Sequence, residues 1–286
     1  MLQDTNRATD RSVARVVEGI GTSDGAGVAL TRIIGQPALP DLDPFLLLDE
    51  FRSDDASDYI AGFPEHPHRG FETVTYMLAG RMRHGDNKGN SGLLTAHSVQ
   101  WMTAGSGIVH SEMPEQEEGL MWGFQLWVNL PAKNKMTAPR YQDIAPERIP
   151  EVERYGARVR VIAGRFDGVA GPVATADTEP TYLDVELTSP DATFETALPA
   201  THNAFVYAYD GSVAIGSTQP RVIARGELAV LSPGERVVAR TQGEKAAFIL
   251  AAGRPLGEPI ARYGPIVMNT QAELRSAFED LRTGRF

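Results

Sequence analysis

The chain has 286 residues, a formal net charge of −10 and no cysteine. The acidic balance argues against general nucleic-acid binding, because phosphate backbones require clustered lysines and arginines. Without cysteine, disulfides, zinc–thiolate sites, iron–sulfur clusters and a cysteine nucleophile are excluded. No segment approaches the ~20 apolar residues of a membrane span, and the polar segment MLQDTNRATDRSV at residues 1–13 lacks an apolar signal core. We therefore expect a cytoplasmic protein that binds neither membranes nor nucleic acid directly.

The first part of the chain predicts short strands, because its segments are rich in β-branched and aromatic residues and end at Gly, Pro, Asp or Asn. Residues 81–94 carry several turn formers in their centre and predict a hairpin. Residues 131–156, with four prolines and many charges, predict a connection between domains. The strands expected before this connection are 12–20, 27–34, 71–78, 98–102 and 119–130.

The pattern of short strands resumes after the connection and gives way to a helix over 270–286. In this helix Leu274, Phe278 and Leu281 recur at helical spacing, and Thr270 with Glu273 predicts a capping box. The strands expected in this part are 157–164, 181–188, 203–211, 213–216, 227–231, 236–241 and 246–253.

The two halves resemble each other. FETVTYMLAG (71–80) and HNAFVYAYDG (202–211) each run an apolar strand into a turn that ends in Gly. Repeats of about 130 residues are too long for a solenoid, whose repeats span about 20–50 residues. We therefore predict an all-β protein of two tandem β-barrels, residues 1–140 and 141–286, with a C-terminal helix that covers one barrel.

Two short segments carry pairs of metal-ligating side chains. His66 and His68 lie two residues apart, as do His110 and Glu112. Residues i and i+2 of an extended segment project from the same face, so two such strands can bring three imidazoles and a carboxylate to one point. A single H-x-H pair is a weak signal, but two pairs next to glycine-rich turns favour a metal site. The isolated histidines have simpler interpretations: His84 is expected to be solvated or to hold its turn, and His97 and His202 to be structural or exposed.

The fourth ligand stays open on these grounds. Glu72 shares the face of His68 if the strand is regular, whereas Glu112 shares the face of His110. Imidazole and carboxylate ligands suit Fe(II), Mn(II), Co(II), Ni(II), Cu(II) or Zn(II) rather than calcium or magnesium. Four protein ligands on an octahedral ion leave two positions open for chemistry. The apolar segment MWGFQLW could line a pocket for a flat aromatic molecule, with Gln125 as a polar contact.

Four motifs stand out along the first half of the chain: FLLLDEF (45–51), HPHRGFETVTYML (66–78), QWMTAGSGIVHSE (100–112) and FQLWVNLP (124–131). In their order and spacing they resemble the motifs of the pirin family of the cupin superfamily. The resemblance implies two cupin barrels with one mononuclear metal, usually iron, in the first. Carried over by motif, the metal ligands are His66, His68, His110 and Glu112, which favours Glu112 over Glu72.

The second barrel is expected to be a metal-free scaffold. When the two halves are aligned on Gly80 and Gly211, Ala197 and Pro199 stand where the first barrel has His66 and His68. The segment ERVVART (235–241) supplies no histidine either.

The resemblance also implies a quercetin 2,3-dioxygenase activity, in which O2 opens the flavonol ring with release of carbon monoxide. In this hypothesis the flavonol chelates the metal, and Glu112 is both a ligand and the base that takes the 3-hydroxyl proton. The alternative is a non-catalytic iron-binding protein that senses redox state and regulates a protein partner. A purely structural zinc site is disfavoured, because no thiolate is present. We expect a monomer.

Overall fold

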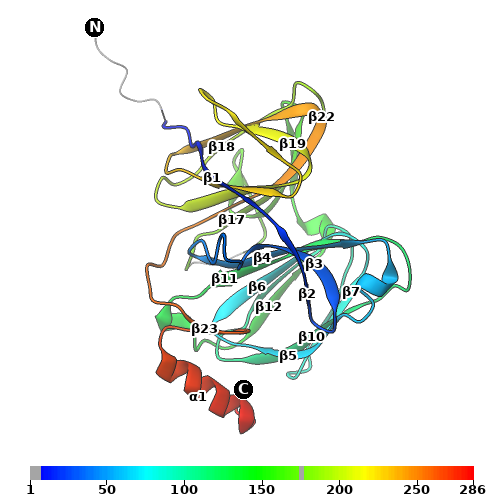
Figure 1. The fold of residues 1–286 in the computed structure, drawn as a ribbon, viewed down its shortest axis with the longest axis vertical. Coiled ribbons are helices and arrows are strands. Elements are labelled where there is room, and N and C mark those ends of the chain that lie inside the picture. Colours follow the sequence, from blue (N-terminus) through cyan, green and yellow to red (C-terminus); the bar gives the residue numbers. More distant parts are fainter. Residues whose placement is uncertain (1–7, 174–176) are drawn as a thin grey trace. The chain divides into compact units, whose positions relative to one another are not determined.

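The computed structural model describes residues 8–173 and 177–286 (Figure 1), so residues 1–7 of the polar N-terminal segment lie outside the described part. Within these ranges β-strands dominate, and the one α-helix is α1, Gln271–Arg282. The all-β prediction with one C-terminal helix is confirmed. No helix in the described ranges is long and apolar enough to cross a membrane.

The chain forms two compact units that do not simply follow its order. Unit 1 comprises Met1–Gly19 and Ile149–Pro255, and unit 2 comprises Ile20–Arg148 and Leu256–Phe286. The N-terminal strand β1 (Val13–Glu18) belongs to unit 1 because it pairs antiparallel with β21 (Glu227–Leu231). The C-terminal helix belongs to unit 2, where it packs against the hairpin of β23 (Ala261–Tyr263) and β24 (Ile266–Met268). Between its two ends the chain passes from unit 2 to unit 1 after Arg148 and returns to unit 2 after Pro255.

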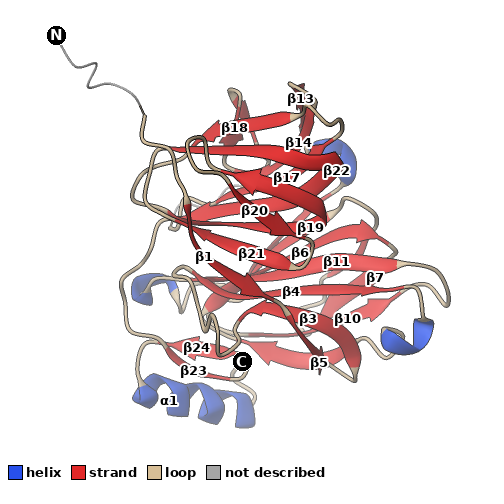
Figure 2. Ribbon diagram, turned by 45° about the horizontal axis from the view of Figure 1, so that its top comes forward, coloured by secondary structure: helices blue, strands red, loops and turns tan. Residues whose placement is uncertain are grey.

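Unit 2 is built from two antiparallel sheets (Figure 2), as in a cupin barrel. Seven strands in the order β12-β9-β6-β11-β4-β3-β2 form the larger sheet, and β5-β10-β7-β8 form the smaller one. Apolar side chains from both sheets pack together, including Leu30, Phe51, Met77 and Met82. The strands are β2 (Ile20–Asp24), β3 (Val28–Ile34), β4 (Phe45–Ser53), β5 (Phe63–His68), β6 (Phe71–Ala79), β7 (Met82–Asp86), β8 (Ser91–Leu94), β9 (Val99–Thr103), β10 (Ile108–Pro114), β11 (Met121–Asn129) and β12 (Arg140–Ile144), with the hairpin β23 (Ala261–Tyr263) and β24 (Ile266–Met268).

Unit 1 contains a nine-stranded antiparallel sheet whose interior is filled by apolar side chains. Val159, Leu183, Phe194, Val206 and Phe248 are typical members of this core, each at most 1% exposed. Its strands, besides β1 and β21, are β13 (Glu151–Arg154), β14 (Ala157–Ala163), β17 (Thr181–Leu187), β18 (Thr193–Ala197), β19 (Asn203–Ile215), β20 (Arg221–Ala224) and β22 (Arg236–Gly253), and a two-stranded ribbon pairs β15 (Arg165–Phe166) with β16 (Val169–Ala170).

The structure differs from the expected elements at the connection between domains and at two long strands of unit 1. The charged connection 131–156 contains strands β12 and β13. Few residues of these two strands are buried, so their sequences lack the alternation of apolar and polar residues that predicts a strand. The strands expected at 203–211 and 213–216 form the single strand β19, because irregular pairing around Gly211 (φ 64°) lets it stay against β22. Strand β22 likewise spans the two strands expected at 236–241 and 246–253.

The C-terminal helix confirms the predicted capping box. The Thr270 side chain accepts from the backbone N–H of Glu273, whose carboxylate accepts from the backbone N–H of Thr270. The buried face differs by one position from the expected stripe. Leu274 and Ala277 are buried, whereas Phe278 is 38% exposed.

Candidate metal centre

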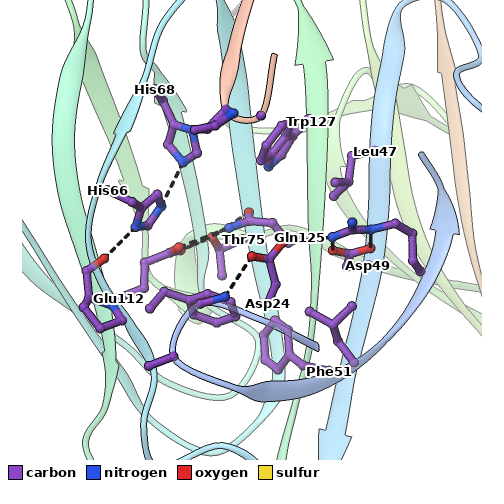
Figure 3. Close-up of a pocket in the computed structure, with 18 of the residues that line it drawn as sticks. Asp24, Leu47, Asp49, Phe51, His66, His68, Thr75, Glu112, Gln125 and Trp127 are labelled. Atoms are coloured by element: carbon purple, nitrogen blue, oxygen red, sulfur yellow. Dashed lines mark hydrogen bonds and ion pairs between the residues drawn. The ribbon is translucent and has the colours of Figure 1, made fainter. Parts of the chain in front are cut away.

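The two predicted ligand segments lie side by side as paired strands. In the antiparallel ladder between β5 and β10, His66 lies opposite His110 and His68 lies opposite Ile108. The Nε2 atom of His66 is 3.0 Å from that of His68 (Figure 3). It is also 3.0 Å from the Nε2 atom of His110. One ligand atom from each imidazole lies within 4.8 Å of the other two. The strand pairing therefore brings together the three histidines that the sequence singled out.

Burial favours the neutral form of the two inner imidazoles. It lowers the pKa of His68 well below its usual value, and the neighbouring His110 and His66 lower it further. Burial also lowers the pKa of His110 to about 4, despite the nearby Glu112 carboxylate. The buried Nδ1 atom of His110 has no hydrogen-bond partner among the described residues. Neutral imidazoles that converge in this way are a donor set that fits a divalent transition-metal ion.

Glu112 lies beside this group of three. Its Oε2 atom is 4.0 Å from Nε2 of His110, and its side chain is 3% exposed. The Thr75 hydroxyl donates to Oε1 at 2.9 Å, and the Gln125 amide donates to Oε1 and Oε2 at 3.3 and 3.2 Å. Gln125, expected as a polar contact for a ligand, thus holds the carboxylate of Glu112. These bonds fix a buried acceptor next to the imidazoles.

Glu72 takes a different direction. Strand β5 ends at His68, and the chain bends at Gly70 (φ 88°) before β6 begins, so Glu72 does not continue the face of His68. Glu72 lies opposite Thr103 of β9 and accepts a 2.6 Å hydrogen bond from its hydroxyl. Glu72 and Thr75 are three residues apart on β6, so their side chains point to opposite faces of the strand. Thr75 faces the cavity. Of the two candidate carboxylates, only Glu112 lies beside the histidines.

A cavity of about 480 Å³ opens between the two sheets of unit 2, and His66, His68 and Glu112 line it. This volume lies in the range of small-molecule sites. Leu30, Phe51, Phe63 and Met82 form an apolar flank. Flat hydrophobic molecules fit such a surface.

Polar side chains also line the cavity, and most of them could not be anticipated from local sequence patterns. Arg32 forms two hydrogen bonds with the Asp49 carboxylate, at 2.9 and 2.7 Å. Arg262, from the β23–β24 hairpin, holds its guanidinium 4.8 Å from the ring centroid of Trp127. Asp49 lies in the FLLLDEF motif, which could have marked it, but no local pattern connects Arg262 with a cavity formed mainly by residues 24–127.

The remaining histidines lie outside the cluster. Of the two roles expected for His84, solvation is wrong: the side chain is 2% exposed, its Nε2 lies 3.2 Å from Asp143 Oδ2, and its ring stacks on Tyr141. His97 is half-buried, with its Nδ1 3.2 Å from the Tyr76 hydroxyl. His202 is 4% exposed. These positions agree with structural roles for His97 and His202.

Comparison with known proteins finds a family match in each half of the chain, and the two matches confirm the predicted tandem cupin fold. The "Pirin" family model matches residues 27–128, and the "Pirin C-terminal cupin domain" model matches residues 182–286. A protein of Pseudomonas aeruginosa, provisionally named as a quercetin 2,3-dioxygenase, is 52% identical over 96% of this chain and 97% of its own. Human "Pirin" is 42% identical over 92% of this chain and 89% of its own. The crystal structure of "Quercetin 2,3-dioxygenase from Acinetobacter baumannii" superposes with a TM-score of 0.87 at 33% identity, covering 96% of this chain and 98% of its own.

Proposed function

Because this chain belongs to the pirin family, we propose that it is a mononuclear, metal-dependent dioxygenase that cleaves quercetin-like flavonols with O2. The observation that carries the proposal is the convergence of three imidazoles, two of which, His66 and His68, line a cavity with an apolar, aromatic flank. The names of the relatives from Pseudomonas aeruginosa and Acinetobacter baumannii support the choice of substrate. Flavonol and O2 are the proposed small-molecule partners.

The proposed metal ligands are His66, His68, His110 and Glu112, with Fe(II) as the first candidate ion. When bound, the ion would act as a Lewis acid toward the substrate oxygens and exchange electrons during the reaction with O2. The lowered pKa values of His68 and His110 support this assignment, because a protonated imidazole cannot ligate. The 4.0 Å distance between His110 and Glu112 supports a carboxylate in the same set.

Glu112 is also the proposed base. It would accept the proton of the flavonol 3-hydroxyl on a carboxylate oxygen. Hydrogen bonds from Thr75 and Gln125 orient that carboxylate. The apolar flank formed by Phe51 and Phe63 with its neighbours would bind the flat rings and exclude water around the reacting atoms.

The test combines metal analysis with turnover. Protein purified without added metal is analysed for its elements and then assayed for loss of quercetin absorbance together with O2 uptake and carbon monoxide release. We expect His66→Ala to lose both metal and turnover. His97→Asn, a control outside the cluster that keeps a residue type tolerant of the left-handed φ of 63° at this position, should keep both.

A metal-loaded protein that shows no turnover with iron, manganese, cobalt, nickel or copper would refute the dioxygenase proposal. That result would favour the non-catalytic alternative, in which the iron site regulates contact with a protein partner.

A further inference from the structure

The last segment of the chain, residues 256–286, lies against the bend that follows His68. Strand β24 runs beside this bend: Ile266 forms a bridge with Arg69, and the N–H of Val267 donates to the Arg69 carbonyl at 3.0 Å. The N–H of Arg69 points to the carbonyl of Pro265 at 3.4 Å. Backbone bonds from β24 therefore hold the residue that directly follows the second histidine.

The Arg69 side chain is held by the same segment. It is only 3% exposed, and its Nη1 forms a 2.9 Å ion pair with Oδ2 of Asp280 on α1. Its guanidinium also lies 4.2 Å from the ring centroid of Phe286. A buried arginine needs such partners, because leaving its charge unpaired would be costly.

Glycine at position 70 allows β24 to approach this closely. Gly70 has a φ of 88°, and a Cβ added there would lie 1.9 Å from the carbonyl oxygen of Val267. Lys135, 1% exposed, donates to the carbonyls of both residues, at 2.7 Å to Gly70 and 3.2 Å to Val267. The Lys135 ammonium group thus joins the bend to β24, in addition to the backbone hydrogen bonds.

The last segment of the chain also packs next to β10, the strand that carries His110. A Cβ added at Gly107, three residues before His110, would lie 2.9 Å from the Phe286 ring. Phe286 therefore packs against residues adjoining both groups of proposed ligands, Arg69 on one side and Gly107 on the other.

We propose that residues 256–286 form part of the metal site, with Arg69 and Asp280 as positioning residues that fix the direction of the His68 imidazole. This inference rests on the proposed function, because it takes His68 as a ligand. The orientation of a ligand at the end of a strand depends on the backbone that follows it, and metal affinity depends on ligands held in place before the ion arrives. The barrel of unit 2 therefore binds its ion fully only when the last segment of the chain is in place.

The experiment measures Co²⁺ affinity of the full chain by competition with a chromophoric chelator, together with the absorption spectrum of the bound Co²⁺. Changing residues that orient metal ligands typically costs 10–100-fold in affinity, and because Asp280 acts one residue further away we expect Asp280→Ala to weaken Co²⁺ binding about tenfold. Glu279→Ala is the matched control, since this neighbouring carboxylate on the same helix pairs with Arg282 at the surface. The control should bind Co²⁺ within about twofold of the unchanged protein.

Arg69→Met provides the second variant. If Asp280 acts through Arg69, the double variant should bind Co²⁺ no more weakly than the worse single variant, whereas independent structural damage would add up. Unfolding of the metal-free proteins is measured alongside. Unchanged Co²⁺ affinity in both single variants, or equal loss in Glu279→Ala, would overturn the proposal. Failure of the unchanged protein to bind Co²⁺ would instead refute the proposed function itself, and this inference with it.

Discussion

The hydrogen bonds on Glu112 make the proposed reaction sensitive to Gln125. Gln125→Leu keeps a side chain of similar size but removes the amide that donates to both carboxylate oxygens at 3.2–3.3 Å. A hydrogen bond to a charged group contributes about 1.5–3 kcal/mol, and because one amide makes two long contacts we use the lower figure of about 1.5 kcal/mol. If these bonds hold Glu112 in its reactive direction, the loss corresponds to a decrease of roughly tenfold in kcat/KM.

Thr75 provides the matched comparison for the same carboxylate. Thr75→Val removes the shorter hydrogen bond, 2.9 Å to Oε1, with almost no change in shape, and should lower kcat/KM for quercetin by a similar factor. Thr75→Ser keeps the hydroxyl and should restore most of the rate. Rates are measured by quercetin absorbance with saturating metal, so that loss of metal does not enter. If Gln125→Leu and Thr75→Val both keep kcat/KM within twofold, the orientation of Glu112 does not depend on these bonds and our reasoning fails.

Three further outcomes are expected. Gly70→Ala should lower the free energy of unfolding by about 3 kcal/mol or more in urea titrations, because its Cβ would meet the Val267 carbonyl. Burial lowers the pKa of Lys135 from 10.5 to about 8, so between these pH values the unfolded chain binds more protons than the folded one. The free energy of unfolding should therefore rise with pH across this window, by up to about 3 kcal/mol relative to Lys135→Met. A difference that falls with pH would contradict this expectation. Removing the metal with EDTA should lower Tm, since an ion at 100 times its Kd stabilises the fold by about 2.7 kcal/mol, and calorimetry checks this.

The parts of the site formed by residues close together in the sequence could be predicted without a structure. Alternation in an extended segment depends only on neighbouring residues, so the pairs His66/His68 and His110/Glu112 could be assigned to common faces without a structure. The capping box at Thr270 could be predicted for the same reason, because its two hydrogen bonds join residues three positions apart. What joins distant segments could not be read in this way. Nothing near Arg262 indicates that its guanidinium lies over Trp127, 135 positions earlier in the chain.

His84 shows why a turn-rich sequence can mislead. Its neighbours predict a hairpin, and the structure has one in β7 and β8. The expectation of a solvated side chain failed because exposure depends on which face of the hairpin turns inward. Gly92, opposite His84 on β8, leaves space for the ring, since a Cβ there would lie 2.2 Å from its Nε2. Asp143, on a strand that the sequence suggested was a connection, then supplies its partner.

The register of β5 against β10 explains why the carboxylate beside the histidines comes from β10 rather than β6. His110 lies opposite His66, but Glu112 lies opposite Phe63, so β5 carries one extra residue in this stretch. Such a bulge bends a strand and re-aims the side chains next to it, and bulges are common beside active sites. The other side of β10 stays regular, with Glu112 directly opposite His84 of β7. Glu112 therefore stays on the inner face of the barrel within reach of Thr75, whereas the bend at Gly70 separates β6 from β5 and leaves Glu72 bonded to Thr103.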